Sequence, residues 1–299
     1  MHKENYYKYF ETSILSEIQH LENYRISTLK KMILTSCMFF LTGIVFLFLF
    51  LYLSFYHKQF FLLFPVLLFF MYTFFLKSII KIIWTEKNYN NWLLENVLPL
   101  FFKPVANFKF WPKNNDIKSI LDSNLFKNID TQEDVSAIFG IYKNTNIIIS
   151  NTKLKLPTKG INKPNLFNGT LIQLELQKPI DNHVIFISKN TPKSNNFKQI
   201  KTNIQDMDKF LYTFAKNSND INFITENFWK NLKKLGEYYI AKDFRLSYNK
   251  NVILIAIGQK KPWFFGSIYK SLLDKKNFDE IINRFTAIYN LVDYITQDG

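Results

Sequence analysis

The stretch that decides the fold is MILTSCMFFLTGIVFLFLFLYLSFY at residues 32–56, followed closely by QFFLLFPVLLFFMYTFFL at residues 59–76. Between Met32 and Leu76 there is no acidic residue, and Lys58 is the sole basic one. Apolar side chains occupy every helical face of both runs, which is typical of a membrane span and not of a surface helix. The sequence therefore predicts an integral membrane protein.

Both runs are long enough to cross a bilayer. A helix rises about 1.5 Å per residue and needs about 20 residues to cross the hydrocarbon core. The first run has 25 charge-free residues, and the second continues past Lys77 and Lys81, whose side chains can snorkel to the headgroups. Residues 57–59 make a short turn. We therefore predict a two-helix transmembrane hairpin over residues 32–84, with spans of about 32–56 and 59–80.

Basic residues flank the predicted hairpin on one side of the membrane. Arg25, Lys30 and Lys31 precede the first span, while Lys77, Lys81 and Lys87 follow the second. The turn between the spans carries Lys58 alone. Because basic flanks stay on the cytoplasmic side, we predict a protein of the cell inner (cytoplasmic) membrane with two spans and both termini in the cytoplasm.

Residues 1–31 have the pattern of an amphipathic helix. Apolar residues recur at helical spacing at Tyr7, Phe10, Ile14, Ile18 and Leu21. This stripe has three candidate partners: the soluble domain, the membrane surface, or a second copy of the chain.

Residues 85–299 have the pattern of a soluble α+β domain with a mainly antiparallel sheet. Strand-like segments lie at 108–111, 135–142, 146–154, 169–176, 184–188, 210–215, 244–247 and 252–257. A hairpin turn is predicted at residues 249–251. Helices are predicted at 88–102, from Thr225 to a stop at Gly236, and after Asn277 to the end of the chain. Strands that cluster first, with helices gathered later, favour α+β over a doubly wound sheet.

The domain is basic and carries no recognisable catalytic motif. From Lys77 onward there are 32 basic and 20 acidic residues, a net charge of +12. Such a charge draws a tethered domain toward anionic lipid, although AT-rich coding DNA would also explain abundant Lys and Asn. The four histidines lack metal-ligand spacing, and no phosphate loop or GxSxG elbow is present. We predict no cofactor and no metal, and an enzyme remains an open alternative.

Two segments combine lysines with aromatic residues. The first surrounds Trp229, with Lys230, Lys233 and Lys234, and is interpreted as an amphipathic helix with a solvated face. The second is a loop that contains the candidate contact residues Lys260, Lys261, Trp263 and Phe264. It either folds back on the core or anchors in the headgroup zone, where Trp, Phe and Lys are common. Neither segment carries an RNA-binding signature, so no nucleic-acid partner is expected.

Several local strings resemble a bacterial family known as domain of unknown function 3137. They are residues 98–102 leading to 107–111, and Leu166-Phe167-Asn168-Gly169-Thr170-Leu171, where the family shows an F-x-G-x-hydrophobic segment. Further strings lie at 210–215 with 222–232, at 244–257 and at 264–272. The resemblance implies a membrane-anchored cytoplasmic domain in bacteria. It implies no activity, and no functional residue carries over.

The leading hypothesis is a membrane-anchored cytoplasmic binding or scaffold module. Its partner would be another protein, an anionic lipid surface or a second copy of the chain, in addition to the bilayer itself. The alternatives are a membrane-bound enzyme whose site is assembled from distant residues, and a bacterial effector inserted in a host membrane.

Overall fold

A computed structural model describes residues 3–56, 64–103, 108–111, 117–157, 165–190, 197–259 and 267–297. The chain divides into two compact units. The helical unit comprises Leu15–Leu93 together with Gly266–Asp274, and the sheet unit comprises Met1–Ile14, Leu94–Phe265 and Lys275–Gly299. The predicted turn at 57–59 lies outside the described residues, and the predicted domain boundaries at 31/32 and 84/85 stay predictions.

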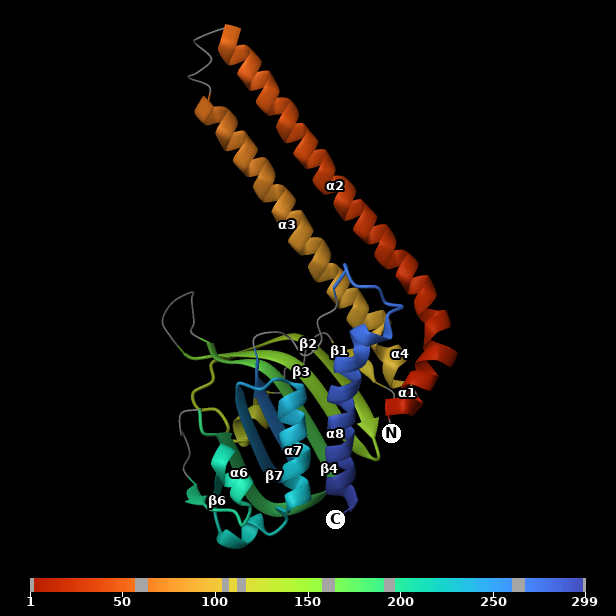
Figure 1. The fold of residues 1–299 in the computed structure, drawn as a ribbon. Helices are drawn as coiled ribbons and strands as arrows, with labels where there is room; N and C mark the ends of the chain where they lie inside the picture. The colour runs from red at the N-terminus through yellow and green to blue at the C-terminus, as the bar shows by residue number, and fades with distance from the viewer. Residues whose placement is uncertain are drawn as a thin grey trace. The chain divides into compact units, whose positions relative to one another are not determined.

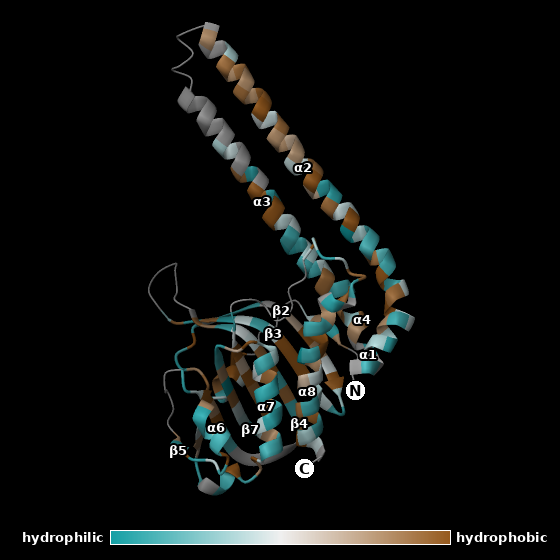
Figure 2. Ribbon diagram, viewed as in Figure 1, coloured by the Kyte–Doolittle hydropathy of each residue, from teal (hydrophilic) through white to brown (hydrophobic). Residues whose placement is uncertain are grey.

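Two long helices make up most of the helical unit. They are α2 (Leu15–Tyr56) and α3 (Phe64–Asn96). Within the described residues, one helical stretch, Tyr7–Tyr52, is long and apolar enough to cross a membrane, and 0% of its most apolar window is buried inside the protein. Figure 2 shows that α2 changes character along its length, from polar residues near its start to apolar residues beyond.

The polar side chains within the apolar part of α2 bond to the helix itself. The hydroxyls of Thr35, Ser36 and Thr42 each donate to the carbonyl oxygen four residues earlier, at 2.8, 3.0 and 2.7 Å respectively. A hydroxyl satisfied in this way costs little in a hydrocarbon environment. These three residues are therefore compatible with a membrane span.

A buried ion pair holds the segment before the last helix against the base of α2. Glu22 and Arg25 are 5% and 7% exposed, and Arg25 Nη2 lies 2.7 Å from Glu22 Oε1. Arg25 also donates to the carbonyl oxygen of Ile268, while Glu22 accepts from the Ser271 hydroxyl and the Leu272 amide. Burial alone would raise the pKa of Glu22, but these hydrogen bonds outweigh it and hold the pKa below its usual range. The pair is therefore ionised at neutral pH.

The sheet unit has an α+β fold with a mainly antiparallel seven-stranded sheet (Figure 1). Its strands are β1 (Lys109–Trp111), β2 (Thr131–Tyr142), β3 (Thr145–Lys155), β4 (Asn165–Ser188), β5 (Lys198–Ile200), β6 (Leu211–Ala215) and β7 (Asp243–Gly258). Its helices are α1 (Lys3–Tyr9), η1 (Phe10–Ile14), α4 (Leu98–Phe102), α5 (Ile117–Asp122), α6 (Gln205–Phe210), η3 (Ser218–Ile221), α7 (Glu226–Tyr238), η4 (Lys275–Phe278) and α8 (Asp279–Gln297).

Strand β4, with 24 residues, organises the sheet. It pairs with β7 over two registers, from Gly169 opposite Gly258 to Ile187 opposite Arg245, with shifts between Glu175 and His183. Its first half also pairs with β3, and its last five residues pair with β6. Three of the other six strands, β3, β6 and β7, are therefore placed directly by this one strand.

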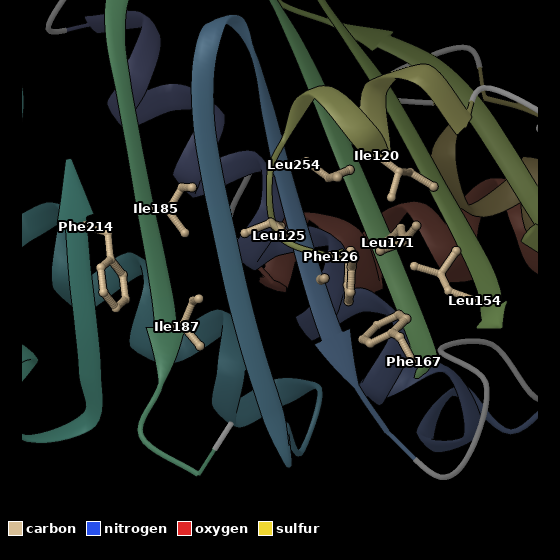
Figure 3. Close-up of a cluster of buried hydrophobic side chains, with 11 residues drawn as sticks. Ile120, Leu125, Phe126, Leu154, Phe167, Leu171, Ile185, Ile187, Phe214 and Leu254 are labelled. Carbon is tan, nitrogen blue, oxygen red and sulfur yellow. The ribbon is translucent and has the colours of Figure 1, made fainter. Parts of the chain in front are cut away.

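The two faces of the sheet are both covered. Side chains alternate along a strand, so Phe186 faces Phe228 of α7, whereas Ile185 and Ile187 point to the opposite face. On that opposite face, the segment around α5 packs Ile120, Leu125 and Phe126 onto the strands (Figure 3). The sheet is therefore a middle layer, with helices α7 and α8 on one face and the segment around α5 on the other.

The start of the N-terminal stripe packs on the sheet unit. The Phe10 ring centroid lies 5.9 Å from that of Phe101 and 6.1 Å from that of Phe278, and Phe10 is 2% exposed. Tyr7 donates a hydrogen bond to Asp279 at 2.5 Å. These residues of the stripe therefore pack on the sheet unit, as the first of the three predicted arrangements requires.

Some predicted boundaries were wrong. The hairpin turn at residues 249–251 does not form, because β7 continues through it and Lys250, with φ of 55°, makes an irregularity opposite the bulged part of β4. The predicted segments at 169–176 and 184–188 are parts of one strand. Helix α7 starts where predicted, with Thr225 as its N-cap, but it runs past Gly236 to Tyr238.

The glycine of the F-x-G string is required by a close approach of two strands. A Cβ at Gly169 would lie 2.1 Å from the carbonyl oxygen of Ile257, which belongs to the backbone of β7 and cannot move aside cheaply.

We expect Gly169→Ala to lower the free energy of unfolding by about 2 kcal/mol, measured by urea unfolding of the full chain in micelles. Gly236→Ala is the control, because its Cβ would lie 3.8 Å from the Phe244 ring, and it should instead stabilise α7 by about 1 kcal/mol. Equal effects of the two substitutions would contradict this account.

Candidate functional site

The two lysine–aromatic segments have different outcomes. Lys260, Lys261, Trp263 and Phe264 lie outside the described residues, so their predicted interfacial contact stays a prediction. The segment around Trp229 is an amphipathic helix, as predicted: Phe228, Trp229, Leu232 and Leu235 of α7 are buried. The lysines at 230, 233 and 234 are exposed.

A groove of about 770 Å³ lies beside α7 in the sheet unit. Four separate segments line it: the end of β4, the junction of α6 with β6, one face of α7, and the chain that leads into β7. The lining residues are Ser188, Lys189, Asn190, Lys209, Phe210, Leu211, Trp229, Leu232, Lys233, Gly236, Glu237, Ile240, Ala241, Lys242 and Phe244. We call this the α7 groove.

The lining residues of α7 follow one helical face. They occur at 229, 232, 233, 236 and 237, and the same spacing reaches Ile240 just beyond the helix. At about 1.5 Å per residue, the lining from Trp229 to Ile240 is about 16 Å long. Gly236 has no side chain to fill the groove at its middle. The volume falls within the range of known ligand sites, which is about 300–1,000 Å³.

The walls of the α7 groove are apolar and its rim is basic. Phe210 is 53% exposed and Ile240 is 72% exposed, so large apolar surface faces solvent on both sides. Lys189, Lys209, Lys233 and Lys242 surround it, against Glu237 among the lining residues. The arrangement suits a ligand that presents apolar groups to the floor and negative charge to the rim.

Asp206 fixes one side of this rim. It accepts a hydrogen bond from the Trp229 indole nitrogen at 2.9 Å and pairs with Lys233 at 3.1 Å. The hydrogen bond from Trp229, and then that from Lys233, hold the pKa of Asp206 below its usual range. Lys233 Nζ also lies 5.5 Å from the centroid of the Phe210 ring. The aromatic and cationic groups of the rim are thus positioned before any ligand binds.

Ile240 occupies a backbone conformation that suits glycine. The Ala241 amide donates to the Gly236 carbonyl and the Ile240 amide to the Glu237 carbonyl, the two bonds of a Schellman motif. The residue at the Ile240 position of this motif adopts positive φ, here 52°. A β-branched side chain in that region is unusual and costs about 1–2 kcal/mol. A strained and exposed isoleucine beside a groove indicates a role other than stability.

One Ser–His pair is present, but its geometry does not support catalysis. His183 Nε2 lies 3.2 Å from Ser247 Oγ and 3.4 Å from the carbonyl oxygen of Ser123. A carbonyl oxygen only accepts, so in the tautomer that bonds to Ser123 the Nε2 atom carries the hydrogen and cannot take a proton from Ser247. Burial also lowers the pKa of His183, and Ser247 is 1% exposed. The pair is a structural contact of the core.

No group of three or more His, Cys, Asp or Glu side chains in the described part of the chain is arranged to hold a metal ion. The lysine–aromatic pattern around Trp229 was the one sequence signal near the α7 groove. Phe210 and Ile240 were missed, because they join the groove only through tertiary folding.

The fold is that of an α+β protein with a long apolar helix near the N-terminus. No protein-family model and no curated protein matches the chain. A crystal structure of the mycobacterial trehalose monomycolate transport factor A, TtfA, is similar over 62% of this chain and 88% of that one. The sequence identity is 10% and the TM-score is 0.32, so this likeness carries no argument about function.

Replacing Ile240 tests its strain directly. Ile240→Gly removes the steric cost of positive φ from the folded state, which stabilises the protein. Glycine also raises the entropy of the unfolded chain, which offsets part of this gain, so we expect a net stabilisation of about 0.5–1 kcal/mol. Ile240→Asn should also stabilise, since asparagine tolerates this conformation. Chemical unfolding of the full chain in micelles measures both. If both variants are less stable than the natural chain, Ile240 contributes to stability and the strain argument is wrong.

Proposed function

We propose that the protein is a membrane-anchored binding module of the inner membrane, with two spans and a cytoplasmic α+β domain. The exposed apolar surface of α2 supports one span. The apolar start of α3 and its exposed Ile79, Ile80 and Ile83 support a second. The basic flanks of both helices support a cytoplasmic location for the termini. The resemblance to the family of unknown function agrees with this architecture and forms part of the proposal.

A reporter fused to the C-terminus tests this topology. A reporter active only in the cytoplasm should be active at this position, and one active only outside the cytoplasm should be silent. The opposite pattern would overturn the proposed orientation, and with it the assignment of the domain to the cytoplasm.

We further propose that the α7 groove binds an acidic amphipathic segment of a protein partner. The carrying observation is the combination of exposed Phe210 and Ile240 with the four rim lysines. A groove about 16 Å long matches about three turns of helix, and a helix in such a groove is anchored at i, i+3, i+4 and i+7. Acidic residues on the flanks of that helix would meet the lysines and discriminate against basic segments.

The lining of the α7 groove favours binding over catalysis. A catalytic site needs a nucleophile, base or acid in reach of the substrate, and the buried Ser247–His183 contact supplies none. The groove instead presents aromatic and aliphatic side chains with separate lysines around them, which is the composition of a recognition surface.

A designed peptide tests the proposed ligand class. The probe is a fluorescent acidic peptide with leucine at i, i+3, i+4 and i+7, titrated into the full chain in phosphatidylcholine nanodiscs. Its controls are a scrambled peptide of the same composition and a basic amphipathic peptide. We expect the acidic amphipathic peptide to bind at least tenfold more tightly than either control, with weaker binding at higher salt.

Variants of the chain locate the binding. Gly236→Leu fills the middle of the groove, and Phe210→Ser removes one wall, so each should weaken binding of the peptide about tenfold or more. Ile141→Ser is the matched control, because Ile141 is also 53% exposed but lies outside the α7 groove. Equal binding of the amphipathic and scrambled peptides would contradict the proposal. So would full binding to both groove variants.

A further inference from the structure

A second groove lies on α2, in the helical unit. It has a volume of about 760 Å³ and is lined by Asn23, Ile26, Ser27, Lys30, Lys31, Ile33, Leu34 and Cys37. Most of these residues recur at intervals of three and four, so they form one face of α2. We call this the juxtamembrane groove.

The lining of the juxtamembrane groove changes character along the helix. The part from Asn23 to Lys31 contains an amide, a hydroxyl and two ammonium groups. The part from Ile33 to Cys37 is apolar, with Ile33 and Leu34 exposed by 51% and 63%. The change falls at Met32, where the charge-free run of the sequence begins. The groove therefore has a polar end and an apolar end at the expected edge of the hydrocarbon core.

We propose that the juxtamembrane groove binds an anionic phospholipid. The phosphate lies between Lys30 and Lys31, with Ser27 as a hydrogen-bond donor, and an acyl chain follows Leu34 and Cys37 toward the bilayer centre. Basic residues next to a span attract anionic headgroups, and apolar side chains next to them give the chain a surface to pack on. This site is separate from the α7 groove, and it rests on the proposed insertion of α2 in a membrane.

The neighbouring charges on α2 do not oppose this assignment. Glu22 and Arg25 precede Lys30 on the same helix, but they are buried and neutralise each other. The hydrogen bonds of this pair to Ile268, Ser271 and Leu272 hold the polar end of α2 in a fixed setting. Along α2 from Arg25 to Tyr56 there is no carboxylate, so no acidic residue of this stretch offsets the charge of the two lysines.

Cys37 is the single cysteine of the chain and lies in the lining, so it gives a specific probe. The full chain is labelled at Cys37 with bimane and placed in nanodiscs of phosphatidylcholine. A small fraction of acyl-brominated lipid is then added, either phosphatidylglycerol or phosphatidylcholine, and quenching is measured. We expect brominated phosphatidylglycerol to quench with about tenfold higher apparent affinity.

Two pairs of substitutions separate a site from a general surface effect. Lys30→Gln with Lys31→Gln should remove the preference for the anionic lipid. Lys77→Gln with Lys81→Gln removes the same charge from α3 and should leave the preference in place. Equal quenching by both lipids, or equal loss in both pairs, would overturn the lipid site. Absence of quenching by either lipid would instead contradict the insertion of α2, so the two failures are distinguishable.

Discussion

Much of the apolar surface of α2 is exposed among the described residues, and this surface is the main constraint on the helical unit. Phe40, Val45, Phe48 and Phe55 are each at least 64% exposed. In water such a surface would drive aggregation, whereas a bilayer removes the cost of exposing it. The hydroxyls bonded back to their own helix, and the lysines placed at its polar end, are compatible with the same environment.

The sheet unit is organised around one long strand, β4. Because β4 pairs with β7 along two registers and with β3 and β6 in turn, the cores on both faces of the sheet are aligned by it. The groove beside α7 then forms where the end of β4 meets the α6–β6 junction. Its apolar walls are bordered by the lysines of the rim and by Asp206, which accepts a hydrogen bond from Trp229. In the two proposals, the sheet unit would recognise a protein segment and the helical unit a lipid.

Local patterns predicted most elements but not the site. Strand-like segments identified strands β2, β3 and β6, and the helix predicted from Thr225 identified the start of α7, because these signals depend on neighbours in sequence. The residues around Lys250 read as a hairpin turn, yet pairing with β4 overrides their preference and leaves an irregularity within β7. The sequence predicted that the helix stops at Gly236, whereas the residue with positive φ that ends it is Ile240. The α7 groove joins four distant segments, so no local pattern encodes Phe210 beside Ile240.

The central claim, that α2 lies in a bilayer and tethers the basic domain, is tested most directly at Cys37. A charged, membrane-impermeant thiol reagent is added to both sides of vesicles that contain the full chain. Hydrocarbon excludes such a reagent and disfavours the thiolate, so labelling should be negligible until detergent and denaturant are added. Rapid labelling of Cys37 in intact vesicles would contradict the account.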